Sequence, residues 1–208
     1  MCLPMEVVIA MAILWKYNRS VQETIRTFIA IQLPQDIKEY LGELTDVLAQ
    51  QVPQRTVRWV RANRMHLTLR FIGETEKNLL PVIGNTLDEV ARQYMPFNLY
   101  LRGFGCFPNC KRPRVLWAGM GGNLETAARL KKDIDATLVP LGWEEESRSF
   151  QPHLTIGRIK DSQAVAGQRW PAELKALPIP VDSIHLIESD LTANGPIYTV
   201  RHSSPLTA

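Results

Sequence analysis

The tripeptide His-Leu-Thr occurs twice, each time followed by an aliphatic residue, and constrains this chain more than any other feature of its sequence. "HLTL" occupies residues 66–69 and "HLTI" occupies residues 153–156, so the two copies lie 87 residues apart (153 − 66 = 87). The chain has only four histidines, and two of them stand in these copies. Each copy lies in a run rich in aliphatic residues, which is typical of a β-strand. The repetition therefore predicts two equivalent strands with the same polar pattern.

The segments around the two copies follow the same order, which is strand, helix, motif strand, helix and strand. In the first half we expect these elements at 26–34, 35–51, 57–73, 76–94 and 97–108, where 57–73 holds either one strand or two strands with a turn at Asn63-Arg64. In the second half we expect them at 113–122, 123–142, 150–160, 162–177 and 179–189, and residues 195–203 add a final strand. Gly73 is expected to end the first motif strand, and a break is expected near Pro171 in the last helix.

This order predicts an α+β fold with two pseudo-symmetric lobes, each an antiparallel sheet backed by helices, and an active-site cleft between the lobes. The 208 residues are 45% hydrophobic, which is enough to bury a core of that size. We expect an N-terminal extension over 1–25 and a bilobed domain over 26–208, with internal repeats at about 26–110 and 111–200. The apolar run in the extension is too short to cross a bilayer.

Strand alternation separates the residues that hold the first copy from those that face outward. Alternate side chains share a face, so His66, Thr68 and Arg70 are expected to point away from the core. The residues between them, together with Phe71, are expected to face the core. In the second copy His153 and Thr155 share the polar face. Two such strands, brought together by symmetry, would place two imidazoles and two hydroxyls around one site.

Such a site suits acid–base attack at phosphorus. A histidine has an unperturbed pKa of about 6.5, so at neutral pH one imidazole can accept a proton while another donates one. Two histidines on opposite sides of a phosphate can therefore activate a water and protonate the leaving oxygen. Threonine hydroxyls can hydrogen-bond the non-bridging oxygens. The sequence has no HExxH motif and no acidic cluster beside either histidine, so we expect no metal and no cofactor.

Both copies resemble the HxTx motifs of the two-histidine (2H) phosphoesterase superfamily. The phrases "RTFIAIQLP", "FGCFPNCKRPRVLWAG", "FQPHLTIGR" and "SIHLIESDLTANGPIYTV" are similar to its branch called RNA 2′,3′-cyclic phosphodiesterase, also known as 2′-5′ RNA ligase. The resemblance runs from about Arg26 to Val200. It implies a bilobed fold and hydrolysis of RNA 2′,3′-cyclic phosphates to 2′-phosphomonoesters, with ATP-independent 2′-5′ RNA ligation as the reverse reaction.

The resemblance also implies residue roles. His66 would be the general acid that protonates the leaving 3′-oxygen, and His153 would be the general base that activates water. Thr68 and Thr155 would bind phosphate oxygens. Arg158 matches a family arginine near the substrate and would bind the phosphate or the base. Strict alternation turns Arg158 away from His153, so this role requires a twist at the preceding glycine.

Other features leave the choice of substrate open. The net charge of +3 and the pI of about 8.8 suit an anionic partner without requiring one. Phe28 and Trp117 lie on equivalent predicted strands, where each is expected either to stack on a nucleobase or to pack in the core. A run of basic residues precedes and enters the first motif and either guides RNA phosphates or forms a solvated surface: Arg55, Arg58, Arg61, Arg64 and Arg70. His185 has no threonine two positions later and is interpreted as structural.

These observations favour RNA ends or cyclic nucleotides as substrates. The alternatives are another 2H phosphodiesterase activity, on 2′-5′ oligoadenylate or ADP-ribose cyclic phosphate, and a non-catalytic RNA-binding protein. Three cysteines without a CxxC motif support neither a disulfide framework nor a zinc site. We expect a cytoplasmic protein, a monomer, with no membrane partner.

Overall fold

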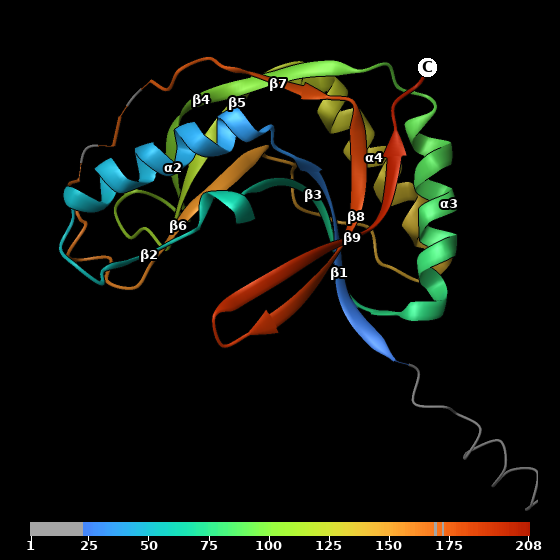
Figure 1. Cartoon of the computed structure of the whole chain (residues 1–208), viewed down its shortest axis with the longest axis horizontal. Helices are drawn as coiled ribbons and strands as arrows, with labels where there is room; N and C mark the ends of the chain where they lie inside the picture. The colour runs from blue at the N-terminus through green and yellow to red at the C-terminus, as the bar shows by residue number, and fades with distance from the viewer. Residues whose placement is uncertain (1–22, 169, 172) are drawn as a thin grey trace, which may run out of the picture.

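The computed structural model describes residues 23–168, 170–171 and 173–208, and shows an α+β fold with two antiparallel sheets (Figure 1). Most of the expected N-terminal extension, residues 1–22, lies outside the described residues. The strands are β1 (Thr24–Gln32), β2 (Val57–Trp59), β3 (His66–Glu76), β4 (Phe97–Phe107), β5 (Val115–Gly122), β6 (His153–Ile159), β7 (Pro178–Val181), β8 (Ser183–Thr192) and β9 (Gly195–Pro205). The helices are α2 (Gln35–Gln50), α3 (Leu80–Ala91), α4 (Leu124–Leu138) and the short η1 (Ala62–Arg64), η2 (Lys77–Leu79) and η3 (Val139–Leu141).

The predicted fold class is confirmed, and each sheet takes strands from both halves of the chain. Sheet A has the order β3-β1-β8-β9, and sheet B has the order β2-β6-β5-β4-β7. The third strand of each predicted repeat is exchanged, because β4 pairs with β5 in sheet B while β8 pairs with β1 in sheet A. The two motif strands, β3 and β6, belong to different sheets and approach one another.

The helices are exchanged in the same way as the strands. Helix α2 follows β1 of sheet A but lies along sheet B, whereas α4 follows β5 of sheet B and packs near β3 of sheet A beside α3 (Figure 1). Ile37, Leu41 and Leu48 form the buried stripe of α2, at the helical spacing seen in the sequence. One main hydrophobic core joins this stripe to both sheets. The exchange makes the two lobes one packed unit.

Three local expectations were wrong. Strand β3 continues past Gly73 to Glu76, because this glycine takes a positive φ of 87° at a register shift and the pairing resumes beyond it. The described residues of 162–177 contain no helix. Gly167, with a φ of 79°, and Pro171 break that segment. The expected strand at 179–189 is two strands, since β7 joins sheet B and β8 joins sheet A.

No helix within the described ranges is both long and apolar enough to cross a membrane.

Candidate active site

The two motif strands share a β-bulge at the fourth residue of the motif. In sheet A, Ala30 pairs with Thr68 and Ile29 pairs with Arg70, which leaves Leu69 without a partner. In sheet B, Trp117 pairs with Thr155 and Leu116 pairs with Gly157. That pairing leaves Ile156 without a partner in the same way. A bulge adds one residue to a strand and therefore reverses the alternation that follows it. The residue five positions after each histidine then faces the same side as the histidine.

In the first copy the bulge exchanges the predicted positions of Arg70 and Phe71. The side chain of Arg70, expected on the polar face, is only 9% exposed and reaches into a buried ionic network, although part of the residue still borders the cleft. Phe71, expected in the core, is 64% exposed and lines the cleft beside His66 and Thr68. A second register shift follows in the same strand, between the partners of Thr27 and Phe28.

In the second copy the bulge turns Arg158 into the cleft. This side chain is exposed and lines the same cavity as His153 and Thr155, so the required twist is present. Its neighbour across the β2–β6 pair is Arg58, which lines the cavity too. Neither guanidinium has an ion-pair partner among the described residues. Two like charges directly opposite one another repel, and a bound anion would remove that cost.

A backbone carbonyl fixes each motif histidine in the same orientation. Nδ1 of His66 lies 3.0 Å from the carbonyl oxygen of Arg64, and Nδ1 of His153 lies 2.6 Å from that of Gln151. In both cases the acceptor is two residues before the histidine. Since a carbonyl can only accept, each Nδ1 carries the proton. Each Nε2 is therefore left to exchange protons with whatever occupies the cleft.

The two imidazoles differ in their surroundings. His66 stacks on Phe28 with ring centroids 4.6 Å apart and meets the edge of Tyr198 at 5.2 Å. Burial among these rings lowers the pKa of His66 to about 4, although its bond to the Arg64 carbonyl opposes the shift. His153 meets Phe107 edge-on at 5.0 Å and Trp117 at 6.1 Å.

The two threonines have free hydroxyl groups. Thr68 and Thr155 are half-buried and line the cleft. Neither hydroxyl makes a hydrogen bond to any residue that the structure describes. A hydroxyl in that position can donate to an anionic oxygen without first losing a protein partner.

All five predicted site residues line one cleft of about 940 Å³, namely His66, Thr68, His153, Thr155 and Arg158. The cleft lies between sheets A and B, with a wall from each motif strand. In the described part of the chain, no group of three or more His, Cys, Asp or Glu side chains is arranged to hold a metal ion.

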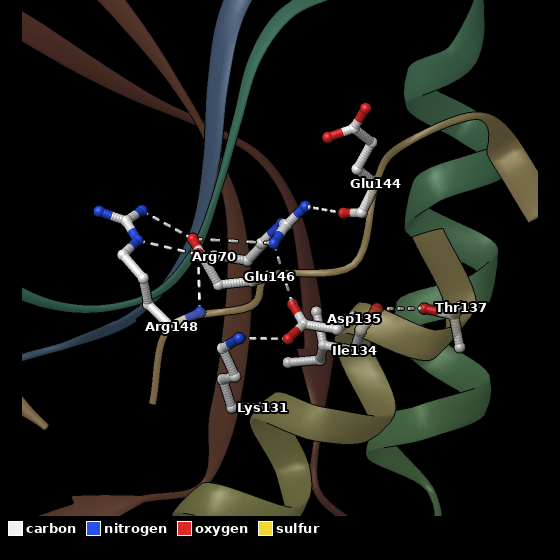
Figure 2. A network of polar contacts seen from close by, with 8 residues as sticks. All are labelled: Arg70, Lys131, Ile134, Asp135, Thr137, Glu144, Glu146 and Arg148. Atoms are coloured by element: carbon white, nitrogen blue, oxygen red, sulfur yellow. Dashed lines mark hydrogen bonds and ion pairs between the residues drawn. The ribbon is translucent and has the colours of Figure 1, made fainter. Parts of the chain in front are cut away.

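A buried ionic network joins the first motif strand to the loop that leads into the second (Figure 2). Arg70 of β3 reaches α4 and that loop at once. Its guanidinium lies 3.7 Å from Asp135 and 4.0 Å from Glu146, and it donates a hydrogen bond to the carbonyl of Glu144. Lys131 also pairs with Asp135. The loop that leads to His153 is therefore held in place by β3, the strand that carries His66.

The two aromatic residues singled out in the sequence both support a histidine. Phe28 is buried under His66, and Trp117 lies over Gly105 with its indole nitrogen buried. Phe28 is too buried to stack on a nucleobase, and Trp117 is half-buried and does not line the cleft. Sequence reasoning missed Phe107 and Tyr198, which complete the two aromatic settings. Their strands, β4 and β9, lie far from the motifs in the sequence, and no spacing rule connects them.

Comparison with known proteins gives a family match and close relatives. The family model described as "LigT like Phosphoesterase" matches residues 31–117 and 122–198. An RNA 2′,3′-cyclic phosphodiesterase of Methanothermobacter thermautotrophicus is 33% identical over 181 residues, covering 84% of this chain and 95% of that protein. The protein of the same name from Aeropyrum pernix is 35% identical over 163 residues, covering 76% of this chain and 90% of that one.

Solved structures show the same fold. The crystal structure of TT0787 of Thermus thermophilus matches with a TM-score of 0.77 and 33% identity, over 88% of this chain and 99% of that one. The crystal structure of Escherichia coli LigT complexed with 3′-AMP matches with a TM-score of 0.72 and 26% identity, over 89% of this chain and 100% of that one.

Proposed function

This chain belongs to the LigT-like phosphoesterase family of the 2H superfamily, and we propose that it hydrolyses RNA 2′,3′-cyclic phosphodiester ends to 2′-phosphomonoesters. One observation carries the proposal. Two HxT strands with the same bulge present two imidazoles, with the same tautomer, and two free hydroxyls to one cleft. That arrangement can donate a proton on one side of a phosphate and accept one on the other without a metal ion.

The proposed roles follow the leaving and attacking oxygens. Water attacks phosphorus while Nε2 of His153 accepts its proton, and the bond from phosphorus to the 3′-oxygen breaks. Nε2 of His66 donates a proton to that oxygen, which leaves a 2′-phosphomonoester and a 3′-hydroxyl. Thr68 and Thr155 donate hydrogen bonds to the non-bridging oxygens, whose negative charge grows in the transition state.

The environment of His66 couples proton uptake to substrate binding. With a pKa of about 4 in the free protein, the imidazole of His66 is neutral at pH 7. Its single proton is on Nδ1, so Nε2 has no proton to donate. A phosphate placed at its Nε2 supplies a negative charge that favours the imidazolium form. We therefore expect His66 to take up its proton as the anionic substrate binds.

The substrate has an anionic part and an aromatic part, and the cleft offers both kinds of partner. Arg158 and Arg58 lie side by side and pair with no carboxylate that the structure describes, so they suit the phosphate. Phe71 offers an exposed ring on the opposite wall, 6.0 Å from Phe28 behind His66. We propose that Phe71 stacks on the base of the terminal nucleotide, a contact worth about 1–3 kcal/mol.

A direct test incubates the protein with adenosine 2′,3′-cyclic phosphate in excess EDTA and identifies the product by ³¹P NMR. We expect adenosine 2′-phosphate, and no product from His66→Ala or His153→Ala. Loss of activity in EDTA, or adenosine 3′-phosphate as the product, would contradict the mechanism. Incubating the 2′,3′-cyclic end of one RNA with the 5′-hydroxyl end of another then tests for 2′-5′ ligation, with no ATP added.

The same preparation separates the rival activities. Turnover of 2′-5′ oligoadenylate or ADP-ribose cyclic phosphate, with none of the RNA end, would assign the cleft to another 2H substrate. Equal RNA binding by the wild type and both histidine variants, with no turnover by any of them, would make the protein an RNA-binding module.

A further inference from the structure

The cleft holds more positive charge than one cyclic phosphate neutralises. Seven arginines line it: Arg26, Arg58, Arg61, Arg64, Arg70, Arg148 and Arg158. Within the part of the chain that the structure describes, only Arg70 and Arg148 of these have a carboxylate partner. Glu146 is the one acidic residue that lines the cleft within those limits, and it serves both of them. Five guanidiniums therefore face a substrate end whose cyclic phosphate carries about one negative charge.

Arg64 is held in place in a way that leaves donors free. Its Nη1 and Nη2 both lie 3.2 Å from the carbonyl oxygen of Asn194, at the tip of the β8–β9 hairpin. Gly195 makes room for this contact, since a Cβ there would lie 2.4 Å from Nη1, and its φ of 98° favours glycine as well. A guanidinium has five N–H donors, so three remain for another acceptor. An ordered arginine without a carboxylate partner is prepared for an anion.

Tyr198 lines the cleft beside His66, on the strand that follows the Asn194 contact of Arg64. Its ring meets His66 edge-on, and its hydroxyl makes no hydrogen bond to any described residue. Burial raises the pKa of this hydroxyl, and the positive charges of Arg64, Arg158 and Arg26 oppose the shift. These three guanidiniums and the unpaired hydroxyl line the same cleft. The hairpin that carries it projects from the body of the molecule (Figure 1). Tyr198 contacts the ring of His66, whereas the described ring contacts of His153 are with Phe107 and Trp117, so this corner belongs to the His66 side of the cleft.

We propose that Arg64, Tyr198 and Arg26 form a second phosphate subsite, which binds the 5′-phosphate of the terminal nucleotide. This proposal rests on the proposed function, because it assumes that the cyclic phosphate lies between the two histidines. In an RNA chain that 5′-phosphate is the diester linking the last nucleotide to the one before it. The subsite would therefore make the enzyme favour the end of an RNA over a free cyclic nucleoside phosphate.

One added phosphate tests the subsite. We would measure kcat/KM for adenosine 2′,3′-cyclic phosphate with and without a 5′-phosphate and take the ratio of the two values. The ratio should be about tenfold or more in the wild type, as one charge-assisted hydrogen bond or two would give. It should also fall as salt rises, because the added contact is ionic.

Substitutions identify the residues that produce this ratio of kcat/KM values. A general loss of activity in a variant lowers both values and cancels in the ratio. Arg64→Met keeps the backbone carbonyl that orients His66 and should bring the ratio close to one. Arg26→Met and Tyr198→Phe should lower it severalfold. Arg92→Met removes an exposed arginine at the end of α3, outside the cleft, and should leave the ratio as in the wild type.

Binding measurements keep this result separate from the proposed function. Calorimetry with adenosine 2′-phosphate and adenosine 2′,5′-bisphosphate requires no turnover and should show tighter binding of the bisphosphate. If the wild type turns over neither cyclic substrate yet shows this preference, and Arg64→Met loses it, the proposed function fails and the subsite stands. A ratio of one for the wild type in both experiments would overturn the subsite. So would a ratio that survives both Arg64→Met and Arg26→Met.

Discussion

Strands β3 and β6 carry the same His-Leu-Thr sequence and the same bulge, yet the residues after the bulge differ. At the first position after the bulge, β3 has Arg70 and β6 has Gly157. At the second position after it, β3 has Phe71 and β6 has Arg158. The first difference follows from the neighbouring elements. A Cβ on Gly157 would lie 2.7 Å from the side chain of Val57 in β2, whereas β3 is the edge of sheet A and leaves Arg70 room to reach α4.

The second difference breaks the symmetry of the site. The same backbone position carries a ring on one wall and a guanidinium on the other, so the repeated scaffold holds an asymmetric cleft. A nucleotide end is asymmetric in the same way, because it has an aromatic base and an anionic phosphate. In the proposed mechanism the duplicated motif supplies the reactive groups, and the residues beyond it set the direction in which a substrate lies.

The largest expected effect comes from the part that the two copies share. Either His66→Ala or His153→Ala should lower kcat by about 10²–10⁴-fold, because each imidazole moves one of the two protons. The kcat of the double variant should be only slightly lower than that of the less active single variant, since the effects of residues that act as a unit are not additive.

His185→Ala is the matched control for that experiment. His185 does not line the cleft, and its ring forms hydrogen bonds with Ser183 and Ser203. The His185→Ala variant should therefore keep its turnover. If one motif histidine variant kept near-wild-type kcat, the two copies would not work as a pair.

The next effect comes from Arg70, for which β6 has no counterpart. Arg70→Met leaves the carboxylate of Asp135 with Lys131 alone and frees the Glu144 carbonyl. It should lower the free energy of unfolding by about 3 kcal/mol, the lower end for a broken buried pair. Chemical denaturation measures this loss.

Arg201→Met is the matched variant on sheet A, where Arg201 pairs with Glu188 at a 39% exposed site. An exposed pair of this kind contributes about 0–1 kcal/mol. Equal losses in the two variants would show that the network around Arg70 does not bind the lobes together.

The sequence predicted the parts of this molecule that repeat. The alternation of His66 and Thr68, the helical stripe of α2 and the order of elements all depend on neighbours within a few residues. The fold class followed from that order. Residues 162–177 were predicted as a helix from composition, and the glycine and prolines in and around the segment outweighed that preference.

The bulges could not be predicted, because a bulge is a property of a pair of strands. Arg70 and Phe71 were assigned to the wrong faces for that reason, and the role of Arg158 depended on a twist that only strand pairing could supply. Tyr198 and Phe107 were missed because they reach the histidines through exchanged strands. Local pattern predicted residues that line one cleft, and long-range pairing decided what surrounds them.

The two histidines can also be compared by titration. His66 should titrate at a pKa of about 4 in the free protein, because burial against Phe28 disfavours its cation. An unfolded histidine titrates at about 6.5, so the unfolded chain binds this proton more tightly between those values. This residue therefore lowers the free energy of unfolding as the pH falls through that window, and its contribution is restored above it.

Heteronuclear NMR of the imidazole nitrogens measures the pKa of His66 with and without adenosine 2′-phosphate. Bound phosphate should raise it, as the proposed acid role requires. A His66→Gln variant identifies the resonances. A value of about 6.5 in the free protein, as in an unperturbed histidine, would contradict the effect of burial on His66.

The smallest effect concerns Phe71, which stands where the other copy has Arg158. Phe71→Ala should raise the activation barrier by about 1–3 kcal/mol for adenosine 2′,3′-cyclic phosphate, the loss expected for a base-stacking contact. A ribose 2′,3′-cyclic phosphate that carries no base should lose nothing, because it has no ring to stack. Phe71→Leu keeps apolar volume without the aromatic face, so its activation barrier for the nucleotide should lie between those of the wild type and Phe71→Ala. Leu191→Ala shortens another exposed apolar side chain of the cleft and should affect both substrates equally. If Phe71→Ala slowed the baseless substrate as much as the nucleotide, the ring would support the strand and the base would bind elsewhere.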